Sequence, residues 1–453
     1  MSFGTQHVVV VVGGAVAGSE AAYQLATRGV LCIVLEQNER PYGKIEDGLP
    51  RWHVNLRRQE AKKIDDKLSC PNVHFVPRTK LGREVTLAEI LDWGVSAVVL
   101  AVGAWRDRPL PVPGIDAYSG RGFYYQNPFV YWFNHYPEPA YRGPKVELAD
   151  GAIVVGGGLA SLDVVKILML ETVTRAFADR GTKVEMYELE HRGIPKVLEE
   201  LGVRFSELGL QGCTLISRRP VEDISLAEMP EDATPDQAAK TRATRRKLLR
   251  NFQDKYLFQF LDRRVAVGCL AERSHLSGLR LAAVKITGAG PVASSEGCEE
   301  HPTALVVSSI GSMPEPIPGV PMGGDRYRIS DLRSGEVEGL ERVFAVGNAV
   351  TGRGNILVSL KHGRRVSQTM LERYLLGTAS GYEEVLAGAA AAARSKVEAV
   401  TVRLAGRAPL PIQEVAAILA HVRALQNRAG YSGSYREWIE QAGSLEKQRV
   451  ASL

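Results

Sequence analysis

The stretch VVVVVGGAVAG at residues 8–18 decides the fold of this chain, and IVVGGGLAS at residues 153–161 repeats its pattern. In each stretch, a run of β-branched residues leads into a glycine-rich turn. Such a run is typical of a strand buried on both faces of a parallel sheet. A glycine-rich turn after such a strand, followed by a helix, is typical of a dinucleotide-binding unit, so two bound nucleotides are expected.

The first turn matches the G-x-G-x-x-G fingerprint with one change. Gly13, Ala15 and Gly18 occupy the three positions, so alanine replaces the middle glycine. The glycines permit a tight turn and close packing of helix on strand, and the helix N-terminus offers free N–H groups to a pyrophosphate. Glu36 ends the next apolar run, where a carboxylate can bind ribose hydroxyls and would repel a 2′-phosphate. The first unit therefore favours FAD.

The second turn has the same spacing, with Gly156, Gly158 and Ser161 at its three positions. Leu159 and Ala160 lie between the turn and the expected helix, and we expect both to contact the second nucleotide. For the first turn, the plainer alternative is a generic glycine turn of an α/β domain, but strand, turn, helix and the acid Glu36 all agree there.

The next strand of the second unit, at residues 214–217, ends in Arg218 and Arg219 where the first unit has an acid. Two guanidinium groups at that corner can bind a 2′-phosphate through charge-assisted hydrogen bonds. The second unit therefore favours NADP(H). Two solvated loop arginines are the plainer alternative.

Composition fits a globular protein of two or three domains: 453 residues, 45% hydrophobic and 24% charged. No apolar stretch of about 18 residues occurs, so no membrane span is expected. The five cysteines form no C-x-x-C pair, which disfavours a metal site and favours a reducing compartment such as the cytoplasm. The net charge of +5 weakly favours acidic partners.

The order of apolar runs predicts an α/β fold with two Rossmann-like, three-layer domains, one inserted in the other, plus a helical C-terminal extension. Proline-rich crossings at residues 108–114 and 313–319 separate the units, and a strand at 342–346 returns to the first. Residues 172–212 are patterned as a helical insertion. The expected domains are FAD-binding 1–110 and 320–380, NADP-binding 111–319, and extension 381–453.

Five stretches together resemble the adrenodoxin-reductase-like ferredoxin–NADP reductases and, more distantly, the small subunit of glutamate synthase. They are residues 41–53, 156–168, 217–220, 310–319 and 346–356. The resemblance covers roughly residues 7–376. It implies a flavoprotein oxidoreductase that transfers electrons between NADPH and a one-electron carrier such as a ferredoxin, because a flavin accepts a hydride and releases single electrons.

The resemblance also implies further cofactor-binding residues. Gly43 and Lys44 fall in the segment that lies under the flavin in that family, and Gly347 and Asn348 fall in the segment that closes over it. Three more residues of the closing segment are expected near the flavin ring: Gly354, Asn355 and Ile356. The chain departs from the family at Ala15 and at Lys44. It also departs at Asn348, where related flavoproteins carry Asp or Trp.

Two residues are candidates for a catalytic role. His53 could adjust proton availability near the flavin or nicotinamide, since histidine titrates near neutrality. A hydrogen-bonded structural histidine is the alternative. Glu228 could lie across the nicotinamide pocket, as an acid does in the resembling family, and an exposed loop glutamate is the alternative.

A basic stretch suggests where a protein partner docks. Its cations are Lys240, Arg242, Arg245, Arg246, Lys247 and Arg250. Arg242, Arg246 and Arg250 share one face of a helix, while apolar residues from Phe252 onward supply its buried side. An acidic iron–sulfur carrier would be steered to such a face, although a solvated helix face is the simpler interpretation. No nucleic-acid recognition motif accompanies the charge.

Three other functions stay open at this point. The chain could deliver NADPH electrons to a larger synthase complex, act as a flavin monooxygenase, or bind nucleotides as a redox scaffold with little turnover. The absence of a cysteine-rich stretch before the first strand disfavours the synthase subunit. The sequence does not set the oligomeric state, the direction of electron flow or the role of residues 381–453.

Overall fold

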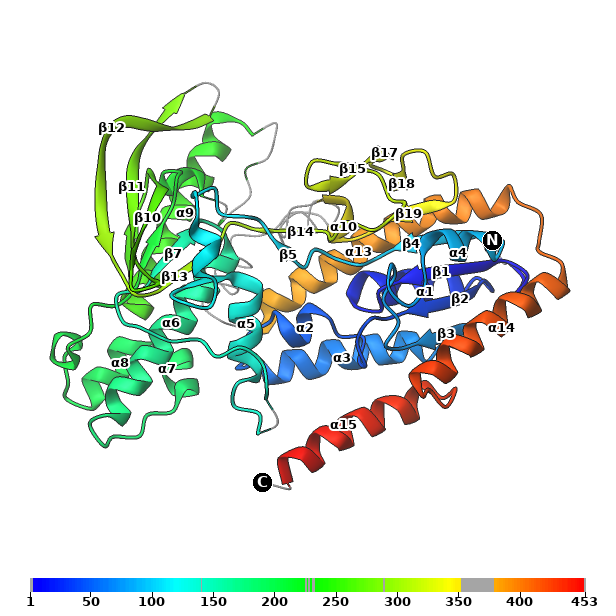
Figure 1. Cartoon of the computed structure of the whole chain (residues 1–453), viewed down its shortest axis with the longest axis horizontal. Helices are drawn as coiled ribbons and strands as arrows, with labels where there is room; N and C mark the ends of the chain where they lie inside the picture. The colour runs from blue at the N-terminus through cyan, green and yellow to red at the C-terminus, as the bar shows by residue number, and fades with distance from the viewer. Residues whose placement is uncertain are drawn as a thin grey trace.

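The computed structural model describes residues 3–139, 141–224, 226, 229, 233–287, 290–351 and 379–451. Figure 1 shows two bodies side by side, each built around a sheet. Two chain crossings connect them through the antiparallel pair β5 (Arg106–Asp107) and β14 (Ser312–Met313). The strands of one body lie in sequence between those of the other, which confirms the predicted α/β fold with one unit inserted.

The first sheet has seven strands in the order β17-β18-β19-β4-β1-β2-β3. Its strands are β1 (Val8–Val12), β2 (Leu31–Leu35), β3 (Val73–Val76), β4 (Ala97–Leu100), β17 (Ile329–Asp331), β18 (Glu336–Val337) and β19 (Val343–Ala345). The stretch from β19 to β3 is parallel, and β17 and β18 add an antiparallel edge. Alternate valines of β1 enter different cores, so this strand is buried on both faces as predicted.

Helices from both ends of the chain cover the first sheet. One face carries α1 (Val16–Ala26), α3 (Val54–Leu68) and α13 (Ala379–Ala405). The other face carries α4 (Leu87–Asp92) and α14 (Ile412–Ala429). The predicted helical C-terminal extension is therefore confirmed, and its helices are integral layers of the first body, with α15 (Tyr435–Ala451) packed beside them (Figure 1).

The second sheet is wholly parallel, in the order β6-β13-β7-β8-β9. Its strands are β6 (Phe123–Tyr125), β7 (Ile153–Gly156), β8 (Thr214–Ile216), β9 (Gln259–Leu261) and β13 (Val306–Ser309). One face packs on α5 (Gln126–His135), α6 (Leu159–Ala178), α7 (Met186–Arg192), α8 (Ile194–Glu200) and α9 (Pro235–Tyr256). Helix α6 extends well into the predicted insertion because its apolar residues continue to Phe177.

The other face of the second sheet is covered by strands that the sequence did not suggest. An antiparallel sheet of β10 (Arg264–Glu272), β11 (His275–Thr287) and β12 (Gly290–Pro302) packs there through Ala266 and three leucines of β11. This layer replaces the helices expected in a three-layer unit. The short elements are α2 (Lys44–Asp47), α10 (Asn348–Thr351), β15 (Met322–Gly323), β16 (Arg326–Tyr327) and 3₁₀ turns at Ile115–Tyr118, Phe205–Leu208 and Val221–Asp223.

Candidate functional site

The first glycine turn is built so tightly that side chains would not fit. Gly13 has φ +98°, and a Cβ there would stand 2.6 Å from the carbonyl oxygen of Ala101. A Cβ on Gly18 would stand 1.7 Å from the carbonyl oxygen of Gly13, so only glycine lets α1 approach β1. The sequence therefore folds into the strand–turn–helix geometry that presents helix N–H groups to a phosphate.

Ala15 is accommodated where the fingerprint has its middle glycine. It precedes α1 in an extended conformation, with φ −70°, which any residue adopts. Its methyl group faces Gly43, whose own Cβ would lie 3.0 Å away, and Gly43 has φ +51°. The methyl group of Ala15 thus takes up room in the phosphate-binding turn. Gly43, which has no side chain, leaves space for this methyl group on the opposite side.

Glu36 is a buried carboxylate beside the first turn. Its Oε2 accepts a hydrogen bond from the Gly14 N–H at 2.9 Å, and its Oε1 accepts one from the Asn38 N–H at 3.0 Å. Burial raises its pKa to about 7, against the lowering effect of these N–H donors. A buried carboxylate at a cavity wall retains lone pairs for further donors, and ribose hydroxyls are such donors.

In the second turn, there is no room for a side chain at Gly156, whereas there is room for one at Gly158. A Cβ on Gly156 would meet the Ser161 Oγ at 2.1 Å and the Ser309 carbonyl oxygen at 2.5 Å. Gly158 precedes α6, and nothing lies within 4 Å of its Cβ position. Leu159 is buried in the core, whereas Ala160 lines the cavity described below. The turn thus leaves the N-terminus of α6 accessible to a phosphate.

Arg218 and Arg219 follow β8 beside this second turn, and both side chains are exposed. The Arg219 N–H donates to the Ser217 Oγ at 3.1 Å, and Ser217 lies against Gly157. Within the described ranges, no carboxylate forms an ion pair with either guanidinium. Two free cations beside a helix N-terminus form a local site for a phosphate group.

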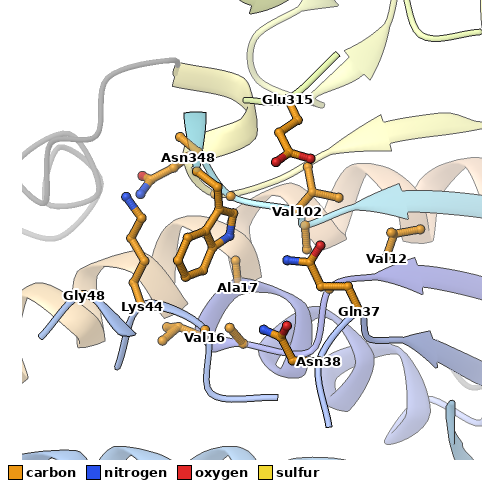
Figure 2. A pocket seen from close by; sticks show the side chains of 18 of the residues that line it. Val12, Val16, Ala17, Gln37, Asn38, Lys44, Gly48, Val102, Glu315 and Asn348 are labelled. Atoms are coloured by element: carbon orange, nitrogen blue, oxygen red, sulfur yellow. The ribbon is translucent and has the colours of Figure 1, made fainter. Parts of the chain in front are cut away.

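One cavity of about 300 Å³ joins the two units (Figure 2). Gly13 and Ala15 of the first turn line it, and Ala160 and Asp163 line it from the start of α6. The other predicted residues of the second unit do not line it: Gly156, Gly158, Leu159, Arg218 and Arg219. Other lining residues are Glu36, Gln37, Asn38, Tyr42, Gly43, Lys44, Trp105, Gln126, Val130, Glu315, Gly347, Asn348, Leu386 and Ala389. All the described residues predicted to bind the first nucleotide, except Gly18, therefore line one cavity together with the start of α6.

The closing strand also reaches this cavity. Gly347 has φ +66°, and a Cβ there would stand 2.9 Å from the Cβ of Ala17. Asn348 begins α10 and faces Lys44 across the cavity in Figure 2. Four other predicted residues lie outside the described residues: Glu228, Gly354, Asn355 and Ile356.

His53 is placed differently from the expectation that it titrates near neutrality beside a cofactor. It is buried at the start of α3, and its Nε2 accepts a hydrogen bond from the Trp52 Nε1–H at 2.9 Å. Burial, together with the charges of Lys166 and Arg57, lowers its pKa to about 3. His53 is not among the residues that line the cavity, so the geometry favours a structural histidine.

The three arginines predicted to share a face of α9 are all exposed, but Arg245 of the same basic stretch is buried. Arg245 points inward and donates to the main-chain oxygen of Glu222, whereas Arg242 and Arg250 are exposed. Arg246 is exposed but pairs with the Glu222 carboxylate at 3.0 Å. A helix turns by about 100° per residue, so neighbouring cations in sequence do not share a face.

No described helix is both long and apolar enough to cross a membrane.

Sequence reasoning missed several residues of the cavity wall. Trp105 and Gln126 line it from the carboxyl ends of β4 and β6, and Leu386 and Ala389 reach it from α13. Ligands of open parallel sheets bind at carboxyl strand ends, so the first two had a positional signal. The α13 residues had none, because only the fold brings the C-terminal region back to the first unit.

Comparison with known proteins adds an independent line of argument. No protein-family model matches the chain. NADPH-ferredoxin reductase FprA of Mycobacterium leprae is 26% identical over 389 residues, which cover 81% of this chain and 84% of that protein. Mitochondrial NADPH:adrenodoxin oxidoreductase of Arabidopsis thaliana is 29% identical over 193 residues, 42% of this chain and 38% of that protein.

The fold agrees with these matches. FprA of Mycobacterium tuberculosis in complex with NADPH has a TM-score of 0.66 at 20% identity, covering 93% of this chain and 90% of that one. The chain is similar over most of its length to reductases of the adrenodoxin reductase/FprA-like type, in sequence and in fold. The resemblance carried by the five sequence stretches is therefore confirmed, and it extends through the C-terminal helices.

The residues present fit the cofactors that this family implies. A cradle that excludes Cβ atoms at Gly13 and Gly347, with the Glu36 carboxylate at its wall, suits a dinucleotide without a 2′-phosphate. The second turn, with its exposed arginines, suits a dinucleotide that carries one.

Proposed function

We propose that the protein is an FAD-dependent oxidoreductase that transfers electrons between NADPH and a one-electron protein carrier such as a ferredoxin. The observation that carries the proposal is the shared cavity, which is lined by Ala15 of the first turn and by Ala160 at the start of α6, directly after the second turn. Two nucleotides held from opposite sides of one cavity bring their redox rings within reach of each other, which is the requirement for hydride transfer.

FAD is assigned to the first unit. Its adenosine ribose would be held by Glu36, and its pyrophosphate would lie at the N-terminus of α1, where Ala15 provides no side-chain cap to compete for the N–H groups. Its ring would then occupy the part of the cavity farther from Glu36, toward Trp105 and the second unit.

NADPH is assigned to the second unit. Its pyrophosphate would lie at the N-terminus of α6, and its 2′-phosphate would bind Arg218 and Arg219. NADH lacks the 2′-phosphate, so it would leave both guanidinium groups without their ligand. Discrimination of about 2–3 kcal/mol, or roughly a hundredfold, is expected from two such charge-assisted hydrogen bonds.

The partner would be an acidic iron–sulfur protein, and its docking surface would include the exposed cations Arg242 and Arg250 on α9. Complementary charge raises association rates at low salt and has less effect at high salt. The five cysteines all lie in described segments and are free, which favours a reducing compartment such as the cytoplasm.

The experiment measures electron flow from NADPH through an added acidic ferredoxin to cytochrome c. Arg242→Glu with Arg250→Glu should lower the ferredoxin-dependent kcat/KM about tenfold at low salt and much less at high salt. Ferricyanide reduction, which needs no docked protein, should not change. The matched control reverses Arg423 and Arg428, two exposed cations of α14 on the other body.

The outcomes separate the parts of the proposal. No stimulation by any acidic ferredoxin would overturn the choice of partner, and equal losses in the α9 and α14 variants would overturn the docking surface. A purified protein with no flavin would overturn the function itself.

A further inference from the structure

A lysine side chain lines the cavity that joins the two units. Lys44 is the first residue of α2, directly after the strained Gly43, and its side chain lines the cavity. Figure 2 shows its ammonium group pointing toward Asn348. Gly43 is the N-cap of α2, and a Cβ built there would lie 3.0 Å from the Cβ of Ala15.

The polar partners of this ammonium group are neutral. Lys44 Nζ donates to Asn127 Oδ1 at 3.3 Å and to Ser312 Oγ at 3.5 Å, and it lies 5.4 Å from the ring centroid of Trp105. Among the described residues, no carboxylate lies within ion-pair distance of it. Charged lysines that are removed from water are normally paired, and among the described residues this one has no carboxylate in direct contact.

The nearest compensating acid is Asp107, which acts at longer range and binds the main-chain N–H of Asn127 at 3.2 Å. Burial lowers the pKa of Lys44 to about 8, and the charge of Asp107 opposes this effect. At pH 7 the group therefore remains largely protonated. The positive charge is retained in the cavity at the expense of protein stability, which is typical of a functional group.

The two ends of the cavity differ in chemistry. Glu36 and Asn38 mark the end suited to the adenosine, whereas Lys44 and Trp105 mark the other end (Figure 2). A dinucleotide that places its ribose at Glu36 and its pyrophosphate at α1 must place its redox ring at this second end. Hydride transfer from NADPH leaves NADP⁺ and brings two electrons and one proton to the flavin, so the ring gains a negative charge.

We propose that Lys44 faces the ring of the bound flavin and sets its reduction potential, by stabilising the negative charge that the ring gains with the hydride. The inference rests on the proposed function, because it requires FAD in this cavity. It gives a role to Lys44, whose charge makes the flavin easier to reduce by NADPH.

The test replaces Lys44 and measures the two-electron midpoint potential of the bound flavin. Lys44→Met should make reduction about tenfold less favourable, which corresponds to a fall of about 30 mV. Lys44→Arg retains the charge and should restore most of the potential. Sulfite adds to the flavin ring and leaves a negative charge on it, so the Met variant should bind sulfite about tenfold more weakly.

The matched control is Lys80, a second lysine of the cavity wall. Its Nζ already pairs with Glu315 at 2.6 Å, near the Glu36 end, so Lys80→Met should leave the potential unchanged. An unchanged potential and sulfite affinity in Lys44→Met, or an equal change in Lys80→Met, would overturn the inference while leaving the proposed function standing. A wild-type protein without flavin would instead overturn the proposed function.

Should Lys44→Met lose its flavin during purification, the potential and sulfite affinity are measured in excess FAD, with Lys44→Gln as a second neutral variant. A fall in both quantities supports the inference, and wild-type values in either neutral variant overturn it.

Discussion

The Glu36 carboxylate accepts a hydrogen bond at 2.9 Å from the main-chain N–H of Gly14, within the first phosphate-binding turn. This contact ties the end of β2 to the turn after β1, so the expected ribose ligand and the expected pyrophosphate site are held at a fixed spacing. Two strands that are neighbours in the sheet thereby form a single nucleotide site.

Loss of the Glu36 charge should therefore weaken FAD binding before it affects the fold. We expect Glu36→Gln to raise the Kd for FAD at least about tenfold, because the carboxylate would accept ribose hydroxyl bonds worth about 1–2 kcal/mol. Fluorescence titration of the flavin-free protein measures this. Glu39→Gln is the control, since Glu39 is exposed and pairs with Arg78. Equal Kd values for both variants would contradict the ribose role.

Two glycines of the second turn should respond differently to alanine. Gly158→Ala should leave Tm unchanged, because nothing lies within 4 Å of its Cβ position, but should raise the KM for NADPH by crowding the phosphate site. Gly156→Ala should lower the free energy of unfolding by about 3 kcal/mol, since its Cβ meets the Ser309 carbonyl. A normal KM in Gly158→Ala would place the phosphate elsewhere.

The pH dependence of stability should carry a signature of His135. Burial lowers its pKa, but hydrogen bonds to Asp47 at 3.0 Å and Glu138 at 2.7 Å outweigh burial and raise it to about 9. A raised pKa in the folded state stabilises the protein fully below about pH 6.5, and this contribution disappears as pH rises through 9.

His135→Gln should accordingly lower the free energy of unfolding by about 2 kcal/mol at pH 6, and by much less above pH 9.5. Denaturant melts across this range give the difference. A difference that stays constant with pH would show that the charge of His135 does not hold α5 to α2.

The C-terminal helix should be essential for the stability of the first body. Trp438 is buried, and its Nε1–H donates to the Glu39 carbonyl at 2.8 Å. Trp438→Ala should cost about 3–5 kcal/mol, as do other large-to-small core changes. Val402→Ala, at a side chain that is 72% exposed on α13, should change Tm little. Equal melting curves would show that α15 is dispensable.

The parts of the fold that sequence predicted are those set by local residue patterns. The valine run of β1, the turn at Gly13 and the acid Glu36 follow one another along the chain, so their geometry depends on little else. The return of β19 to the first sheet was also predictable, because an apolar run ending in Gly347 matches the end of a buried parallel strand.

The parts that sequence could not predict depend on contacts between distant segments. His53 loses its titration near neutrality because the fold buries it beside Lys166, which pairs with Glu190 inside the second body. The sequence pattern did not predict the β10–β12 layer, because its strands are largely exposed on one side and lack a sharp hydrophobic alternation. Helix α13 lines the cavity at Leu386 through tertiary packing alone.

The central claim is that one cavity brings a flavin and NADPH together, and anaerobic titration of the purified protein tests it most directly. NADPH should bleach the bound flavin at far lower concentration than NADH. Replacing Arg218 and Arg219 by alanine should raise the half-saturating NADPH concentration about a hundredfold and leave that of NADH unchanged. A bound flavin that NADPH does not bleach would contradict the claim. An equal rise in the half-saturating concentrations of NADPH and NADH in the double variant would also contradict it.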